Sequence, residues 1–116
     1  MYNDASQQTE AILGRHLRAF ANGDVDAIIN DYTDESVLFT PGGTVRGLTQ
    51  LRKFYDGILT DQPGYFLNFD MMFKDVEGDV GFIVWFSDPE APMGTDTFVV
   101  RDGKIVTQTF RQAQLQ

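Results

Sequence analysis

Helix-forming patterns fill the first half of this sequence and strand-forming patterns fill most of the second half, and this order limits its fold more than any other feature. Residues that would share one helix face recur early in the chain, as Ile12, His16 and Phe20 do at i, i+4 and i+8. The tripeptide Asn22–Asp24 then supplies a helix stop and a new N-cap. The predicted helices are Ser6–Ala21, a short helix with Val25, Ile28, Ile29 and Tyr32 on its inner side, and Gly47–Leu59.

The strand patterns indicate an antiparallel sheet. The segments EGD (residues 77–79) and RDGK (residues 101–104) are tight-turn signals, and strands joined by tight turns run antiparallel. Helices first and strands second favour an α+β fold, with the helices packed on one face of the sheet. The predicted strands are Ser36–Thr40, Tyr65–Val76, Val80–Ser87, Thr95–Arg101 and Lys104–Gln112.

Both faces of these strands carry apolar side chains. Phe82, Val84 and Phe86 alternate with Ile83 and Trp85, so the two sets lie on opposite faces. A sheet that is apolar on both faces needs two covers, and the helices supply one of them. A second copy of the chain is the simplest second cover, which predicts a homodimer through the outer sheet face. Alternation leaves open whether Trp85 faces a pocket or this interface.

Composition narrows the class of partner. The 116 residues suit a single domain spanning residues 1–116. A net charge of −8 disfavours binding to nucleic acid or to a membrane surface. One histidine and no cysteine predict no metal site, and no organic cofactor is implied. The chain begins without a secretion-signal pattern, so a cytoplasmic location is expected. The acidic residues around the second helix are expected to form a cap and a solvated face: Asp24, Asp26, Asp31, Asp34 and Glu35.

Asp96 interrupts an otherwise apolar strand face. Alternation places it on the same face as Phe98 and Val100. A carboxylate at such a position lies at an edge, is paired, or serves chemistry. Burial would raise its pKa, and ionisable groups with shifted pKa values concentrate at functional sites. The alternative is a strand-end aspartate that bonds to a backbone amide or to solvent.

Several short motifs, taken in order, resemble the nuclear transport factor 2-like superfamily, and within it the ketosteroid isomerases and SnoaL-like polyketide cyclases. The resemblance covers nearly the whole chain and implies a cone, in which a strongly curved sheet wraps around three helices and leaves a pocket at the open end. That fold hosts isomerases, dehydratases, cyclases, epoxide hydrolases and proteins without catalysis, so it does not determine the function. The motifs are GD (23–24), DYTDESV (31–37), GLTQLRKFY (47–55), DTF (96–98) and DGKI (102–105).

The resemblance assigns roles to Asp96 and His16. Asp96 matches the protonated acid with which ketosteroid isomerases stabilise an oxyanion, and in the cyclases a carboxylate in this region resembles the acid–base residue. His16 matches the catalytic tyrosine of the isomerases, and an imidazole there could donate, accept or shuttle a proton. From spacing alone, His16 could instead be a core histidine with one buried partner.

Further residues are expected to support the site. Tyr32 and Tyr55 match tyrosines that support the catalytic one in some isomerases, and here they could orient His16; the alternative is aromatic packing with the hydroxyl groups at the surface. Trp85 and Phe98 are candidates for contact with the ligand, which the aromatic content predicts to be a small apolar or aromatic molecule.

Thr40 departs from the isomerase pattern. The isomerases carry a general-base aspartate immediately before the proline that follows the first strand, and this sequence has Thr40 before Pro41. A threonine hydroxyl cannot accept a proton near neutral pH, so steroid isomerisation is not predicted and Thr40 is left as a supporting pocket residue.

Two functions stay open. One is proton transfer by Asp96 and His16 on a hydrophobic or polyketide-like molecule, as an isomerisation, cyclisation or dehydration. The other is a dimeric binding or interaction domain without catalysis.

Overall fold

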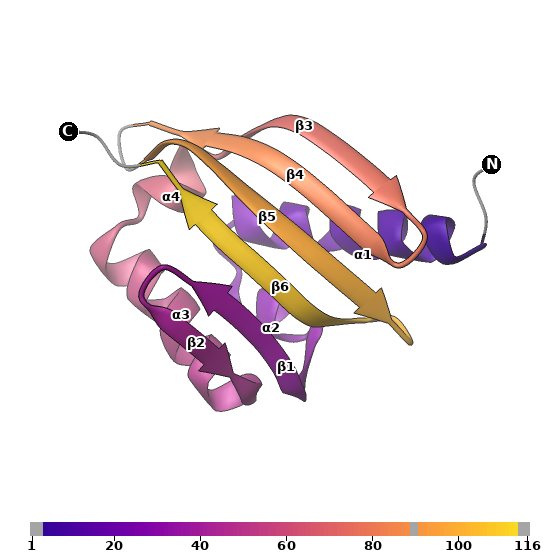
Figure 1. The fold of residues 1–116 in the computed structure, drawn as a ribbon. Coiled ribbons are helices and arrows are strands. Elements are labelled where there is room, and N and C mark those ends of the chain that lie inside the picture. Colours follow the sequence, from indigo (N-terminus) through magenta and orange to yellow (C-terminus); the bar gives the residue numbers. More distant parts are fainter. Residues whose placement is uncertain (1–3, 89–90, 114–116) are drawn as a thin grey trace.

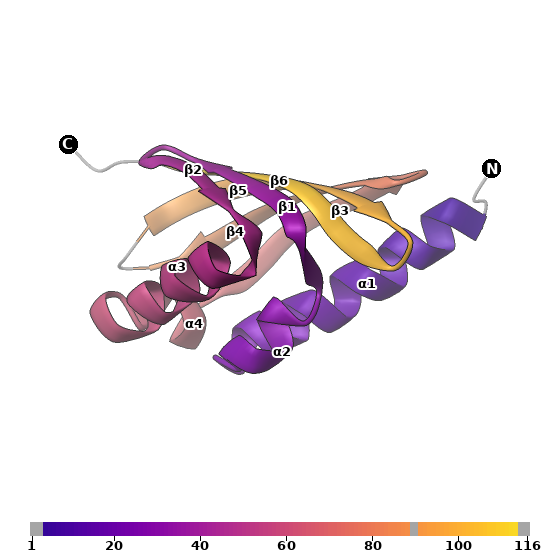
Figure 2. The same ribbon diagram turned by 90° about the horizontal axis from the view of Figure 1, so that it is seen from below.

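The computed structural model describes residues 4–88 and 91–113, which form a curved six-stranded sheet with helices on one side (Figure 1). Viewed from below, the helices all lie against the same face, and no described helix covers the opposite face (Figure 2). The predicted α+β class and curved sheet are confirmed. The elements are α1 Asp4–Ala21, α2 Val25–Ile29, β1 Tyr32–Thr40, β2 Gly43–Arg46, α3 Gly47–Asp61, α4 Gly64–Leu67, β3 Asp70–Glu77, β4 Val80–Ser87, β5 Ala91–Arg101 and β6 Lys104–Gln112.

The sheet is mixed rather than purely antiparallel. Its strand order is β2-β1-β6-β5-β4-β3, and all neighbours are antiparallel except β1 and β6, which pair in parallel. The prediction of an antiparallel sheet is wrong at this pair because tight-turn signals report only on strands that a hairpin joins. Both tight-turn signals are confirmed, since β3 pairs with β4 and β5 with β6 in antiparallel hairpins. In the second turn Asp102 and Gly103 both have positive φ, 53° and 76°, as a type I′ hairpin turn requires.

Strand β1 begins four residues earlier than predicted. Tyr32 is its first residue rather than part of the second helix, and it pairs with Ile105 of β6. This places the Tyr32 side chain between the sheet and the helices. The short strand β2, which the sequence did not predict, follows the turn at Pro41 and Gly42 and pairs with β1.

The predicted strand Tyr65–Val76 is wrong in its first part, which forms helix α4. Pro63 precedes this helix with φ −61° and ψ −18°, and its carbonyl accepts hydrogen bonds from the N–H groups of Phe66 and Leu67. Alternating apolar residues in this segment imitate a strand. Tyr65 and Phe66 are nevertheless both buried while Leu67 is 80% exposed, which is the pattern of a single helical turn.

The two faces of the sheet have different surroundings. Trp85 is buried on the inner face, beneath the helices, which settles the question that its alternation left open. The outer face exposes large apolar side chains, among them Phe39, Phe73 and Phe82, which are 48%, 52% and 36% exposed. None of the helices in the described part of the chain is long and apolar enough to cross a membrane.

Candidate active site

A cavity of about 50 Å³ lies between the inner face of the sheet and helices α1, α3 and α4. That is several times the roughly 10–15 Å³ that one water molecule needs. Polar groups reach it from His16, Tyr55, Asp96 and Gln108. Most of the remaining wall is aromatic, which suits a small ligand with an apolar body. The aromatic lining residues are Phe20, Phe54, Tyr55, Tyr65, Phe69, Trp85, Phe98 and Phe110.

Asp96 supplies the carboxyl group of the cavity. The indole Nε1 of Trp85 donates to its Oδ1 at 2.7 Å, and the amide Nε2 of Gln108 donates to its Oδ2 at 2.6 Å. Burial in this largely apolar site disfavours the charged form and raises the pKa of Asp96 to about 7, although both hydrogen bonds act in the opposite direction. A carboxyl group with this pKa is available as an acid and as a base near neutral pH.

A glycine makes room for the indole of Trp85. Gly94 pairs with Trp85 across β4 and β5, and a Cβ atom at Gly94 would lie 2.1 Å from the indole ring. The indole also stacks on Phe110, with ring centroids 5.9 Å apart and an angle of 12° between the planes. The lack of a side chain at Gly94 thus lets Trp85 lie over the sheet and reach Asp96.

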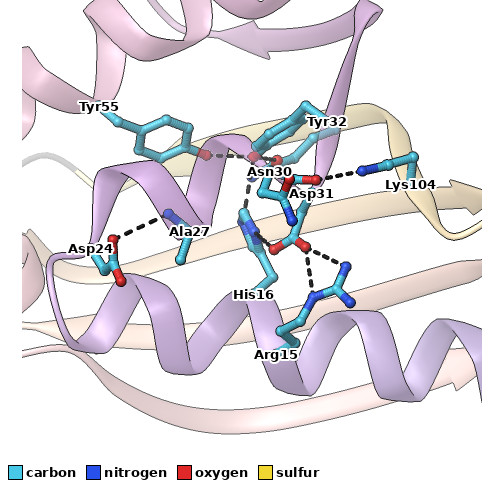
Figure 3. A network of polar contacts seen from close by, with 10 residues as sticks. Arg15, His16, Asp24, Ala27, Asn30, Asp31, Tyr32, Tyr55 and Lys104 are labelled. Carbon is cyan, nitrogen blue, oxygen red and sulfur yellow. Dashed lines mark hydrogen bonds and ion pairs between the residues drawn. The ribbon is translucent and has the colours of Figure 1, made fainter.

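His16 is held by a buried carboxylate that the sequence did not identify. Its Nδ1 lies 3.0 Å from Oδ2 of Asp31, while Arg15 donates to Oδ1 of Asp31 from Nε at 2.9 Å and from a terminal nitrogen at 2.6 Å (Figure 3). Burial alone would raise the pKa of Asp31, but the hydrogen bonds and charges of His16 and Arg15 outweigh it and lower the pKa. Asp31 is therefore a carboxylate that fixes the His16 ring.

Tyrosine hydroxyl groups connect His16 to the cavity acid. The hydroxyl of Tyr32 lies 3.4 Å from Nε2 of His16 and 2.6 Å from the hydroxyl of Tyr55, and it donates to Oε1 of Gln108 at 2.5 Å. Desolvation raises the pKa of both tyrosines, so both stay neutral at physiological pH. A continuous chain of hydrogen bonds therefore runs from Asp96 through Gln108 and Tyr32 to His16.

The structure gathers most of the predicted site residues and adds two others. Asp96, His16, Tyr55, Trp85 and Phe98 line the cavity, and Tyr32 lies directly behind it. The added residues are Gln108 and Asp31. Gln108 could have been suspected from the predicted hairpin of β5 and β6, in which it pairs with the inward-facing Phe98. Its pairing with Leu38 of β1 was not predicted.

Two predictions about individual residues need correction. Asp31 was expected on a solvated face, yet it is fully buried, because Arg15 and His16 of α1 fold over it. Thr40 does not line the cavity. Its hydroxyl lies in the β1–β2 turn, where it donates to the carbonyl of Gly43 at 2.8 Å and accepts from the N–H of Gly42 at 3.1 Å. Within residues 4–88 and 91–113, no three acidic or histidine side chains are placed to hold a metal ion.

With the geometry established, comparison with known proteins identifies the family. Residues 13–108, most of the chain, match the SnoaL-like domain. The chain belongs to the SnoaL-like domain family. The resemblance to the nuclear transport factor 2-like superfamily is thereby confirmed. No curated protein sequence matches this SnoaL-like chain.

Solved structures share the fold of this SnoaL-like domain. An NTF2-like protein of unknown function from Mesorhizobium loti is 28% identical, with 97% of this chain and 96% of that chain covered and a TM-score of 0.81. A candidate polyketide cyclase from Sinorhizobium meliloti is 17% identical, with 86% and 93% covered and a TM-score of 0.73. A candidate ketosteroid isomerase from Kribbella flavida is 12% identical, with 96% and 82% covered and a TM-score of 0.77. At the last two identities the likeness extends to the fold alone.

Proposed function

We propose that this SnoaL-like domain transfers protons on a small apolar or aromatic molecule, in an isomerisation, cyclisation or dehydration. The observation that supports this most is Asp96, a carboxyl group 7% exposed, whose pKa is raised to about 7 at the wall of an aromatic cavity. General acid–base catalysis is most effective when the pKa of the catalytic group lies near the working pH.

The other polar groups of the cavity suit supporting roles. His16 and Tyr55 both line it, and each could turn the hydrogen that faces the Tyr32 oxygen toward a carbonyl or hydroxyl oxygen on the ligand. Tyr55 is neutral at physiological pH because burial raises its pKa. The aromatic walls would hold the body of the ligand and exclude water, which strengthens each of these polar interactions. In this proposal Asp96 moves the proton, while His16 and Tyr55 polarise the reacting group.

The first test is an NMR titration of the Asp96 side-chain carboxyl carbon, identified by its loss in Asp96→Asn. The expected pKa is near 7, because desolvation disfavours the carboxylate. Addition of 2-tetralone, a small aromatic ketone with acidic C–H bonds beside the carbonyl, is expected to raise it further, since the ligand displaces water from the cavity. A value at or below the ~3.9 of a free aspartate would contradict the proposal. A raised pKa of Asp96 that does not change when 2-tetralone is added would favour a structural role for Asp96 in a binding domain.

We also propose that the outer sheet face forms a homodimer. Phe39, Phe73 and Phe82 are exposed there, and the rings of Phe73 and Phe82 lie 6.3 Å apart as one apolar patch. Exposed apolar patches on a sheet favour association, because burying them removes apolar surface from water.

Light scattering after gel filtration tests the dimer. The expected mass is twice the 13.1 kDa of one chain, and Phe82→Glu is expected to reduce it to one chain, because a charge cannot be buried unpaired in the interface. Leu67→Glu is the matched control, since Leu67 is 80% exposed and lies on α4, on the side of the helices. A wild-type mass of one chain would refute the dimer.

A further inference from the structure

The hydroxyl group of Tyr32 has more partners than it has hydrogens. It contacts Gln108, Tyr55 and His16, and it can donate one hydrogen. The contact to Gln108 uses that hydrogen, because the amide oxygen of Gln108 can only accept. The other two partners must then donate to the Tyr32 oxygen. Tyr55 donates through its hydroxyl, and His16 must carry a hydrogen on Nε2.

The second ring nitrogen of His16 must also carry a hydrogen. Nδ1 lies 3.0 Å from Oδ2 of Asp31, which Arg15 helps to keep ionised and which therefore only accepts. With the amide of Gln108 in this orientation, both nitrogens of His16 are protonated and the ring is positively charged. In the same orientation the Gln108 nitrogen and the Trp85 indole both donate to Asp96, which favours its ionised form.

A protonated Asp96 favours the opposite orientation of Gln108. Its carboxyl group then has one hydrogen to donate, and the amide oxygen of Gln108 can accept it once the amide turns over. Oxygen and nitrogen of an amide have nearly the same size, so the turn requires no repacking. The amide nitrogen then donates to the Tyr32 oxygen. Tyr32 is free to donate its own hydrogen to Nε2 of His16, and a neutral His16 with hydrogen on Nδ1 satisfies every contact.

We propose that Gln108 is a positioning residue that couples the protonation of Asp96 to that of His16. An ionised Asp96 accompanies a doubly protonated His16, and a protonated Asp96 permits a neutral His16. The combination of an ionised Asp96 with a neutral His16 is disfavoured, because two acceptors, the Tyr32 oxygen and Nε2, would face each other without a hydrogen. This coupling follows from the hydrogen-bond chain and does not depend on whether the site turns over a ligand.

Within residues 4–88 and 91–113, few groups contact either end of this hydrogen-bond chain. Asp96 receives hydrogen bonds from Trp85 of β4 and Gln108 of β6. His16 faces Asp31, between α2 and β1, and Tyr32 of β1. Its ring also makes a T-shaped contact with the ring of Phe98 of β5 at a centroid distance of 5.7 Å. Arg15 acts on His16 through Asp31. Gln108 and Tyr32, both neutral, therefore form the route of hydrogen bonds between Asp96 and His16.

Nitrogen NMR of the histidine ring tests the coupling on the wild-type chain. The sequence contains one histidine, so protein labelled with ¹⁵N in histidine gives one pair of ring signals. Burial raises the pKa of Asp96 to about 7, so at pH 8 the Asp96 carboxyl carbon is expected to show the ionised shift. Both ring nitrogens of His16 are expected at the shifts of a protonated imidazole at this pH. A neutral His16 beside an ionised Asp96 would overturn the proposal.

Two variants separate the relay through Gln108 from simple attraction between charges. In Gln108→Met, Tyr32 is free to donate to His16, so the Nε2 signal is expected to move to its unprotonated position at pH 8. If charge attraction alone protonated His16, that signal would stay where it is, and the role of Gln108 would be refuted. Asp96→Asn, which imitates the protonated acid, is expected to give the same neutral ring. Gln112→Met, on the same strand, is the control and should leave both ring signals unchanged. Should Gln108→Met fail to fold, the wild-type spectrum at pH 8 still tests whether an ionised Asp96 occurs together with a doubly protonated His16.

Discussion

Asp96→Asn is expected to slow deuterium exchange at the carbon beside the 2-tetralone carbonyl by about 10²–10⁴-fold, the range typical for loss of a general acid–base group. Asparagine keeps the size of the side chain and can still accept from the indole of Trp85. It can neither take up nor release a proton at neutral pH, so the chemistry is lost while the cavity is retained. Exchange is measured by proton NMR in heavy water.

The same substitution is expected to stabilise the fold at high pH. The pKa of Asp96 is about 7 in the folded chain and ~3.9 in the unfolded chain. At a pH below both pKa values, Asp96 is protonated in the folded and in the unfolded chain, so its ionisation does not affect stability. Between them the unfolded state ionises first, so the wild type loses stability as pH rises from about 4 to 7. Three pKa units correspond to roughly 4 kcal/mol as an upper limit.

Urea unfolding at pH 5 and pH 8.5 measures this effect. The free energy of unfolding of Asp96→Asn should exceed that of the wild type by more at pH 8.5 than at pH 5. Asp56→Asn, an exposed substitution on α3 that removes the same charge, serves as the control for the change in net charge. Equal behaviour of the two variants would show that Asp96 is not a desolvated acid. A variant that gains stability and loses exchange would fit a site where function is retained at the expense of stability.

Local patterns predicted helices α1 to α3 and the two hairpins and placed Asp96 on an apolar strand face, because each of these depends on residues close in the sequence; they mistook α4 for the start of a strand. They did not predict the parallel pairing of β1 with β6, whose residues Val37 and Thr107 meet only in the fold. The burial of Asp31 was missed for the same reason. In sequence it is one of several acids near α2, and its burial depends on Arg15, sixteen positions earlier.

The site contains two buried aspartates whose pKa values are shifted in opposite directions. Burial in a largely apolar cavity raises the pKa of Asp96, whereas His16 and Arg15 lower that of Asp31. Such a division separates a group that exchanges protons from one that stays charged and holds a partner in place. Alternation along β5 predicted the first group, and no local pattern distinguishes the second.

Asp31→Asn is accordingly expected to destabilise the fold by roughly 3–5 kcal/mol at neutral pH, the range for removing one partner of a buried ion pair. Asp31 is fully buried and accepts hydrogen bonds from both Arg15 and His16. Its folded pKa is lower than its unfolded one, so its contribution is present above about pH 4 and is lost as pH falls through the folded value. The difference in the free energy of unfolding between Asp31→Asn and the wild type should therefore shrink toward acidic pH. At Asp96 the variant is instead expected to become more stable than the wild type as the pH rises.

Urea unfolding from pH 3 to pH 8 measures this trend, and Asp26→Asn is its matched control. Asp26 also pairs with an arginine, Arg52, at 2.8 Å, but its side chain is 85% exposed. An exposed pair contributes less than about 1 kcal/mol, because water and salt screen it. If Asp26→Asn and Asp31→Asn lowered the free energy of unfolding by the same amount, burial would add nothing to the strength of the Asp31 pair. A large loss confined to Asp31, and greatest at neutral pH, would show that this carboxylate holds α1, and with it His16, against the site.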